Sequence, residues 1–119
     1  MHNFKELKIW QKGRNYVKEI YLTVSKFPPE EKFALTSQMK RAVISIPSNI
    51  AEGAGRRTDK DFLRFLDIAN GSAFELETHI YLAYDLDFIN EETLNNLITN
   101  IEEIEKMIFG FKKTLNEND

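Results

Sequence analysis

The 119-residue sequence has no cysteine and only three prolines. Without cysteine, the protein can form neither disulfides nor thiolate metal sites. No apolar run reaches the ~18 residues typical of a membrane-spanning helix, and the first residues show no apolar stretch followed by a cleavage site. We therefore expect a cytoplasmic protein that does not enter a membrane. The length predicts a single domain over residues 1–119.

Motifs for catalysis, metal binding and nucleotide binding are also missing. There is no HExxH motif and no P-loop, and the only histidines are His2, in a terminus expected to be mobile, and His79. Bundles that hold two iron ions use Glu-x-x-His, but Leu76 stands three residues before His79, which we therefore expect at the surface or the edge of the core. A phosphate-binding loop would have to follow a strand, and no strand is predicted before Gly53 and Gly55. We expect no enzyme activity, catalytic residue, metal, cofactor or small-molecule substrate.

Apolar residues, in contrast, recur at helical spacing in four segments. The expected core positions are Trp10, Gly13, Val17, Ile20 and Val24; Leu35, Met39, Val43, Ile46 and Ile50; Phe62, Leu66, Ala69, Ala73, Leu76, Ile80 and Ala83; and Leu94, Leu97, Ile101, Ile104, Ile108, Phe111 and Leu115. Steps of three and four set helices at about 20° to one another. The spacing predicts an all-α fold, an antiparallel up-down-up-down four-helix bundle with short loops.

The boundaries of these helices carry recognisable residues. Proline disfavours helix in the residue before it, so Pro28 ends the first segment. The second helix is expected to begin at Thr36. Thr58 and Asn90 can cap the third and fourth helices, because their side-chain oxygens accept from backbone N–H groups of the first turn.

The stretch SIPSNIAEGAGR places Pro47 inside the second predicted helix. Pro47 cannot donate to the carbonyl of Val43. The helix therefore kinks there, or it breaks and Ser45 caps a new helix. The apolar spacing continues through the stretch and favours a kink. Gly53 and Gly55 then end the helix in the left-handed conformation, or they are points of close contact with a neighbour.

The net charge of −3 hides an asymmetry along the chain. Residues 1–64 hold thirteen Lys and Arg against seven Asp and Glu, whereas residues 65–119 hold three against twelve. A basic half can contact nucleic acid, or the two halves can attract each other between subunits. Alternatively, antiparallel helices place both signs side by side, with ion pairs such as Arg41–Glu52 and Arg64–Asp61. The candidate nucleic-acid-binding residues are Lys12, Arg14, Lys18, Lys40, Arg41, Arg56, Arg57, Lys60 and Arg64.

Some apolar residues lie outside the core seams. Leu63, Phe74 and Tyr81 of the third segment lie roughly 100° from its seam. They form either a self-association patch or the edge of a wide apolar face.

The segments LKIWQKGRNYVKEIY, FPPEEKFALTSQMKRAVISIPSNIAEGAGR and FLRFLDIANGSAFELETHIYLAYDL resemble the four-helix-bundle family of 23S rRNA intervening-sequence proteins, over nearly the whole chain. The residues of its signature include Ser45, Pro47, Asn49, Glu52, Gly53, Gly55, Arg56, Gly71, Ser72 and Glu75. The resemblance implies antiparallel bundles that assemble into rings, typically pentamers. The related accessory variability proteins of diversity-generating retroelements are basic rings that bind a reverse transcriptase and nucleic acid. The acidic balance of this chain departs from theirs.

We therefore expect a non-enzymatic homo-oligomer, a pentamer by the resemblance, that binds RNA or a ribonucleoprotein through a basic surface. The alternative is an assembly or adaptor protein that binds no nucleic acid and whose basic and acidic halves meet across subunits. An enzyme with a site in the pore of the oligomer is the third and least favoured interpretation.

Overall fold

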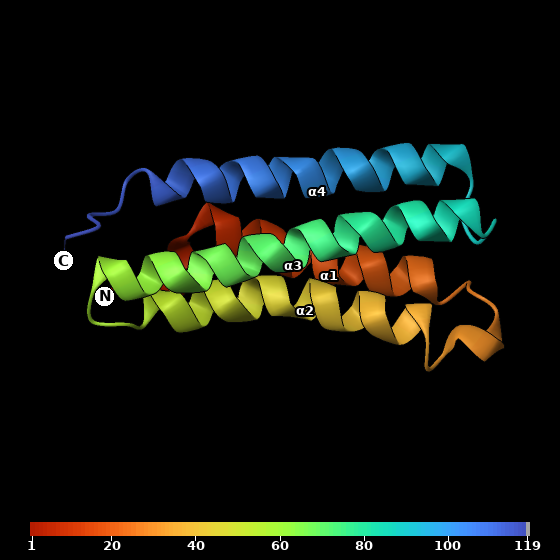
Figure 1. The fold of residues 1–119 in the computed structure, drawn as a ribbon, viewed down its shortest axis with the longest axis horizontal. Coiled ribbons are helices and arrows are strands. Elements are labelled where there is room, and N and C mark those ends of the chain that lie inside the picture. The colour runs from red at the N-terminus through yellow and green to blue at the C-terminus, as the bar shows by residue number, and fades with distance from the viewer. Residues whose placement is uncertain (119) are drawn as a thin grey trace.

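Four long helices make up the fold in the computed structural model, which describes residues 1–118 (Figure 1). Helix α1 spans Lys8–Val24, α2 spans Leu35–Ala54, α3 spans Asp59–Asp85 and α4 spans Glu91–Lys112, with two short 3-10 helices, η1 at Phe4–Glu6 and η2 at Pro29–Glu31. No strand occurs among the described residues. The predicted all-α class is confirmed.

Consecutive helices run in opposite directions along the long axis of the molecule (Figure 1). Both termini and the α2–α3 loop therefore lie at one end, which we call the terminal end. The α1–α2 and α3–α4 connections lie at the other, the distal end. None of the helices within residues 1–118 combines the length and the apolar character needed to cross a membrane.

The core follows the predicted seams on α3 and on most of α4. All seven expected positions of α3 are buried, as are the five from Leu94 to Ile108 on α4. Phe111 is only partly buried, and Leu115 lies beyond the end of α4. On α2, Leu35 is partly buried and the other four expected residues are buried.

The prediction for α1 was wrong at two positions. Ile9 and Tyr16 are buried there, whereas Trp10 and Val17 pack only against the edge of the core. The same 4-3 spacing runs through Ile9 and Tyr16, so periodicity alone did not decide between the two faces. Tyr16 tolerates burial because its hydroxyl donates to the Leu97 carbonyl of α4 at 2.7 Å.

The helix boundaries agree closely with the sequence. The Thr58 and Asn90 side chains cap α3 and α4 by accepting from the backbone N–H groups of Asp61 and Thr93. Helix α2 begins one residue earlier than predicted, and its first N–H, at Leu35, donates to the Glu31 side chain at 3.3 Å rather than to the N-cap residue Ala34. Two of the loops, residues 55–58 and 86–90, are short, but the α1–α2 connection takes residues 25–34 because it includes η2.

Helix α2 passes through Pro47 without a break, as the apolar spacing favoured. Pro47 faces α1 at Gly13, where an added Cβ would lie 3.6 Å from the proline ring. The prediction of a left-handed glycine at the end of α2 was wrong. Gly55 has a φ of −85°, and no glycine among the described residues has a positive φ. The chain leaves α2 through right-handed turn conformations, so the end of this helix does not depend on glycine's access to the left-handed region.

Candidate functional site

Several signature residues meet at the seam between α2 and α3. The Ser45 and Ser72 hydroxyls lie 2.8 Å apart across this seam, and the Asn49 amide donates to the Ser45 hydroxyl and carbonyl. A Cβ on Gly53 would lie 2.7 Å from Phe65 Cβ. These residues hold two helices close together, so this part of the signature has a packing role.

Gly71, another signature residue, is not explained by packing within the chain. It lies in the middle of α3 and is exposed, and a Cβ added there would meet no atom within 4 Å. Glu75, one turn further along α3, is also exposed and forms no ion pair within residues 1–118. A glycine in the middle of a helix lowers the stability of the helix by about 1 kcal/mol relative to alanine. Its presence on an open surface is consistent with close approach of another molecule.

The predicted basic residues near Arg56 do come together, at the terminal end. Arg56, at the end of α2, and Arg64, on α3, both place their guanidinium groups against the ring of Phe65, at 4.7 and 5.5 Å from its centroid. Arg57 and Lys60 lie in and just after the connecting loop, and neither forms an ion pair with any described residue. We call Arg56, Arg57, Lys60, Arg64 and Phe65 the terminal cluster.

Two of its arginines form weak pairs with carboxylates. Arg56 pairs with Glu52 at 3.1 Å, and Arg64 pairs with Asp61 at 3.7 Å. The second pair was expected, but the expected Arg41–Glu52 pair is not formed, because Glu52 pairs with the arginine one helical turn away. All four side chains are more than 40% exposed, and exposed pairs typically contribute less than about 1 kcal/mol. The arginines can therefore exchange these partners at little cost.

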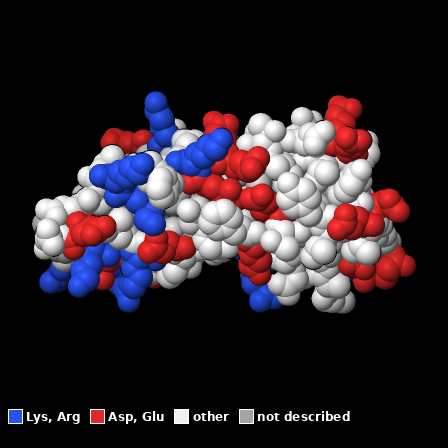
Figure 2. Space-filling view, turned by 45° about the horizontal axis from the view of Figure 1, so that its top comes forward, with Lys and Arg blue, Asp and Glu red and all other residues white. Residues whose placement is uncertain are grey.

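Helix α4 adds basic residues to the same end. Lys112 forms an ion pair with Asp67 of α3, and Lys113 lies over the ring of Phe109 at 4.6 Å. On the face that Figure 2 draws, most Lys and Arg side chains gather toward one end, whereas carboxylates and uncharged residues cover the rest. The sequence had shown the asymmetry only as one half of the chain against the other.

The remaining candidate residues do not join the terminal cluster. Arg14 lies over the Trp10 ring and Lys40 over the Tyr21 ring, both between α1 and α2. Lys18 and Arg41 are exposed on the same two helices. Lys12 lies between α1 and α4. The nine predicted residues therefore form three groups rather than one surface.

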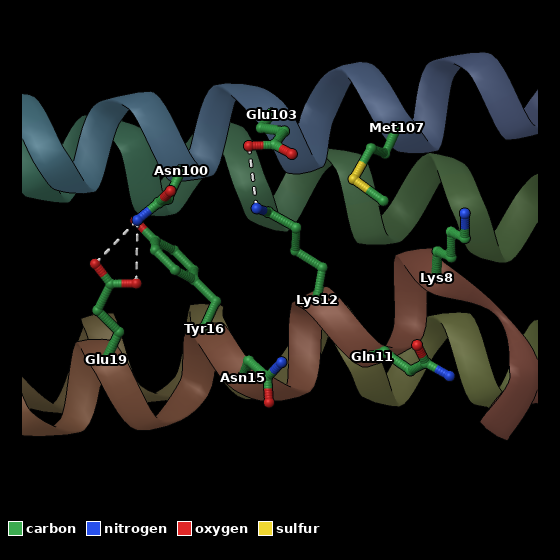
Figure 3. A pocket seen from close by; sticks show the side chains of 9 residues that line it. All are labelled: Lys8, Gln11, Lys12, Asn15, Tyr16, Glu19, Asn100, Glu103 and Met107. Atoms are coloured by element: carbon green, nitrogen blue, oxygen red, sulfur yellow. Dashed lines mark hydrogen bonds and ion pairs between the residues drawn. The ribbon is translucent and has the colours of Figure 1, made fainter.

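Lys12 belongs to a polar groove of about 360 Å³ between α1 and α4. In Figure 3, Lys12 reaches across to Glu103 and Asn100 reaches across to Glu19. The first contact measures 3.0 Å, and the Asn100 amide lies 3.2 and 3.3 Å from the two Glu19 oxygens. Because these contacts cross the groove, its polar groups largely satisfy one another.

The α3–α4 seam holds a carboxylic acid with an unusual pKa. Burial, followed by interaction with Glu77 and Glu102, raises the pKa of Glu105 to about 8. Its Oε2 is buried and has no hydrogen-bond partner among the described residues. Burial also raises the pKa of Tyr16, so its hydroxyl stays protonated and keeps its bond to α4.

The two histidines have structural surroundings. His79 is half-buried at the edge of the core, as predicted, and its Nδ1 is buried without a partner among the described residues. His2 is not in a loose terminus. Its ring packs against Phe62 and Phe111, its backbone N–H donates to the Ala54 carbonyl, and its Nε2 lies 3.5 Å from Asp59. Within residues 1–118, no group of three His, Asp or Glu side chains is arranged to hold a metal ion.

Comparison with known proteins decides the family. The family model for the 23S rRNA-intervening sequence protein matches residues 5–110, which include all four helices almost completely. The chain belongs to this family. The resemblance inferred from the sequence is thus confirmed, and the signature seam described above lies inside the matched region of this intervening-sequence protein.

The fold also matches that of a solved structure. A protein of unknown function from the S23 ribosomal protein family of Bacteroides thetaiotaomicron VPI-5482, solved at 1.70 Å, superposes with a TM-score of 0.79 at 24% identity. The match covers 88% of this intervening-sequence protein and 98% of the solved chain. At this identity, the likeness shows a common fold alone. No curated protein matches the sequence.

Two parts of the site were missed by sequence reasoning. Phe65 was not among the candidate binding residues, yet it organises the terminal cluster, since Arg56 and Arg64 both contact its ring. Arg64 is next to Phe65 in the sequence, so their contact could have been foreseen. The contact between Arg56 and Phe65 depends on how α2 and α3 pack. Glu105 was missed because its pKa depends on burial between helices and on Glu77, which is 28 positions away in the chain.

Proposed function

We propose that this intervening-sequence protein is a non-enzymatic, cytoplasmic homo-oligomer that binds RNA through its terminal cluster. The observation that carries the proposal is the arrangement of Arg56 and Arg64 against the ring of Phe65. Beside them, Arg57 and Lys60 form no ion pair with any described carboxylate. The name of the matching family, which refers to 23S rRNA, points to the same class of partner.

The chemistry of the terminal cluster suits a flexible or unpaired RNA segment. Lys and Arg bind phosphates with release of counterions, which makes affinity depend on salt. Guanidinium planes and aromatic rings stack on unpaired bases. Since both ion pairs of the cluster are exposed, phosphates can replace Glu52 and Asp61 as the partners of the arginines.

Self-association is supported by apolar residues on the surface. Phe74 is 54% exposed and Tyr81 is 45% exposed, and Gly71 leaves space for a close neighbour. An oligomer would present several terminal clusters to one RNA, so weak individual contacts would add up to a higher apparent affinity. The resemblance to ring-forming relatives favours a pentamer.

Fluorescence anisotropy with a labelled single-stranded fragment of 23S rRNA tests RNA binding. Reversing two cations of the cluster in one variant, Arg57→Glu with Lys60→Glu, should weaken binding at least tenfold, because it removes two phosphate contacts and adds repulsion. The matched control reverses two exposed cations at the distal end, Lys26→Glu with Lys32→Glu, and has the same net charge. Equal affinities for the two variants would contradict the proposed site.

One observation favours the adaptor alternative. No Lys or Arg occurs from residue 65 to residue 105, so one side of the molecule is acidic while α1 and α2 carry many cations. If the terminal cluster meets that acidic surface on a second copy, Arg56→Glu or Arg64→Glu should dissociate the oligomer. Light scattering would then show a lower mass. An unchanged mass would exclude the terminal cluster from the subunit interface.

A further inference from the structure

The last turns of α4 carry an exposed aromatic ring among lysines. Residues 65–119 contain three cationic side chains, and these are the neighbours Lys106, Lys112 and Lys113. Phe109 lies between them in the sequence and is 56% exposed. The half of the chain that is otherwise acidic therefore places all of its positive charge around one exposed ring.

Lys106, Phe109 and Lys113 share one face of α4. They stand three and four positions apart, so they follow one another along a single stripe of the helix. The Lys113 ammonium lies 4.6 Å from the centre of the Phe109 ring. Gly110 leaves the backbone beside the ring uncovered, since an added Cβ there would meet no atom within 4 Å. We call Lys106, Phe109, Gly110 and Lys113 the α4 patch.

The two lysines of the α4 patch are available to an anionic ligand. Lys106 and Lys113 form no ion pair with any described residue. Among the nearby carboxylates, Glu103 has its own lysine partner across the polar groove, and Glu102 is exposed to solvent. Glu105 adds little negative charge at neutral pH, because burial raises its pKa to about 8.

The α4 patch continues the surface of the terminal cluster. Helix α4 finishes at the terminal end, where the chain also passes from α2 to α3 (Figure 1). The ion pair between Lys112 and Asp67 joins α4 to α3 there, and Asp67 follows Arg64 of the terminal cluster by one helical turn. A single RNA strand can therefore pass from the terminal cluster over Lys112 onto the α4 patch.

We propose that the α4 patch is a second contact site for the same single-stranded RNA, where a base stacks on Phe109 and phosphates bind Lys106 and Lys113. The inference rests on the RNA binding in the proposed function and adds a separate site to it. Aromatic rings in a basic surface suit single strands, because every base offers a flat face for stacking. Since the two sites act on one strand, affinity should rise with the length of the RNA.

Substitutions of Phe109, measured with RNAs of two lengths, test the α4 patch. Labelled single strands of about 4 and about 16 nucleotides, the two ends of the usual range of site sizes, are compared by fluorescence anisotropy. Phe109→Leu keeps an apolar side chain but removes the ring, so it should weaken binding of the longer strand about fivefold or more and lose most of the gain from length. Phe109→Trp should keep that gain, because indole also stacks. Lys106→Ala with Lys113→Ala should make the salt slope for the longer strand shallower by about 1.4.

Phe33→Leu is the matched control. Phe33 is also an exposed ring with a lysine over it, Lys32 at 5.4 Å, but it precedes α2 at the distal end. This change should leave the affinity for both strands at the wild-type value. Equal losses in Phe33→Leu and Phe109→Leu would contradict a specific site on α4.

The outcomes separate this inference from the proposed function. If Phe109→Leu binds the longer strand as tightly as the wild type while Arg57→Glu with Lys60→Glu loses affinity, the α4 patch is contradicted and the terminal cluster is not. The reverse result supports the α4 patch and contradicts the terminal cluster. A wild-type protein that binds neither strand contradicts both.

The fold and the mass of Phe109→Leu are checked by circular dichroism and light scattering. Because the ring is exposed, both should match the wild type. A lower mass would place Phe109 at a contact between subunits and would contradict its role in stacking on RNA.

Discussion

Gly53 and Gly71 are both helical glycines of the family signature, but their surroundings are opposite. A Cβ on Gly53 would overlap Phe65 at 2.7 Å and Phe62 at 2.8 Å. One on Gly71 would enter open space. The sequence alone treats the two alike, because glycine weakens any helix by a similar amount. Only the packing of α3 on α2 distinguishes them.

This difference predicts opposite effects of the same substitution. Gly53→Ala should lower the free energy of unfolding by about 1–3 kcal/mol, because the rigid neighbours at this site must move. Gly71→Ala should raise it by up to about 1 kcal/mol through helix propensity. Urea denaturation of both variants at one protein concentration measures the two changes. A stabilising Gly53→Ala would show that α2 and α3 are farther apart than described.

The amount of structure that could be predicted differs between helices for a physical reason. The seam of α3 was predicted completely, because its seven apolar residues keep the four-three spacing along the whole helix. On α1, two neighbouring faces are apolar, and the hydrogen bond of Tyr16 to the Leu97 carbonyl, which the sequence does not reveal, decides between them. The terminal cluster was predicted by composition, but its organisation around Phe65 depends on contacts between helices.

The α3–α4 pair should respond to pH through Glu105. Its folded-state pKa is raised to about 8 from 4.5, so the folded protein holds a proton that the unfolded chain releases at lower pH. The contribution of Glu105 to stability is therefore complete below pH 4.5 and is lost as the pH rises through about 8. Burial of Glu105 is the main cause of the raised pKa, followed by its interaction with Glu77 across the seam.

Glu105→Gln tests this effect because the amide keeps the shape but cannot ionise. We expect the variant to gain stability over wild type as the pH rises from about 4.5 to about 8, and to differ little from it at the lower end. Urea midpoints across this range measure the difference, with the exposed Glu117→Gln as the control. A difference that is independent of pH would contradict the assignment.

The distribution of charge over the whole molecule carries the functional argument. A net charge of −3 would argue against nucleic-acid binding if it were spread evenly. The bundle instead gathers cations at its terminal end and along the α1–α2 face, and leaves residues 65–105 without Lys or Arg. The proposed function uses this arrangement, in which cations at the terminal end would attract a phosphate backbone.

The salt dependence of RNA binding tests the central claim most directly. If Arg57 and Lys60 contact phosphates, the affinity of the wild-type protein for the single-stranded 23S rRNA fragment should fall linearly on logarithmic axes as salt increases. Arg57→Ala with Lys60→Ala should make this slope shallower by about 1.4, since each contact on a single strand contributes about 0.7. The control, Lys26→Ala with Lys32→Ala, should keep the wild-type slope. Binding that does not depend on salt, or slopes that are equal in both double variants, would contradict RNA binding through the terminal cluster.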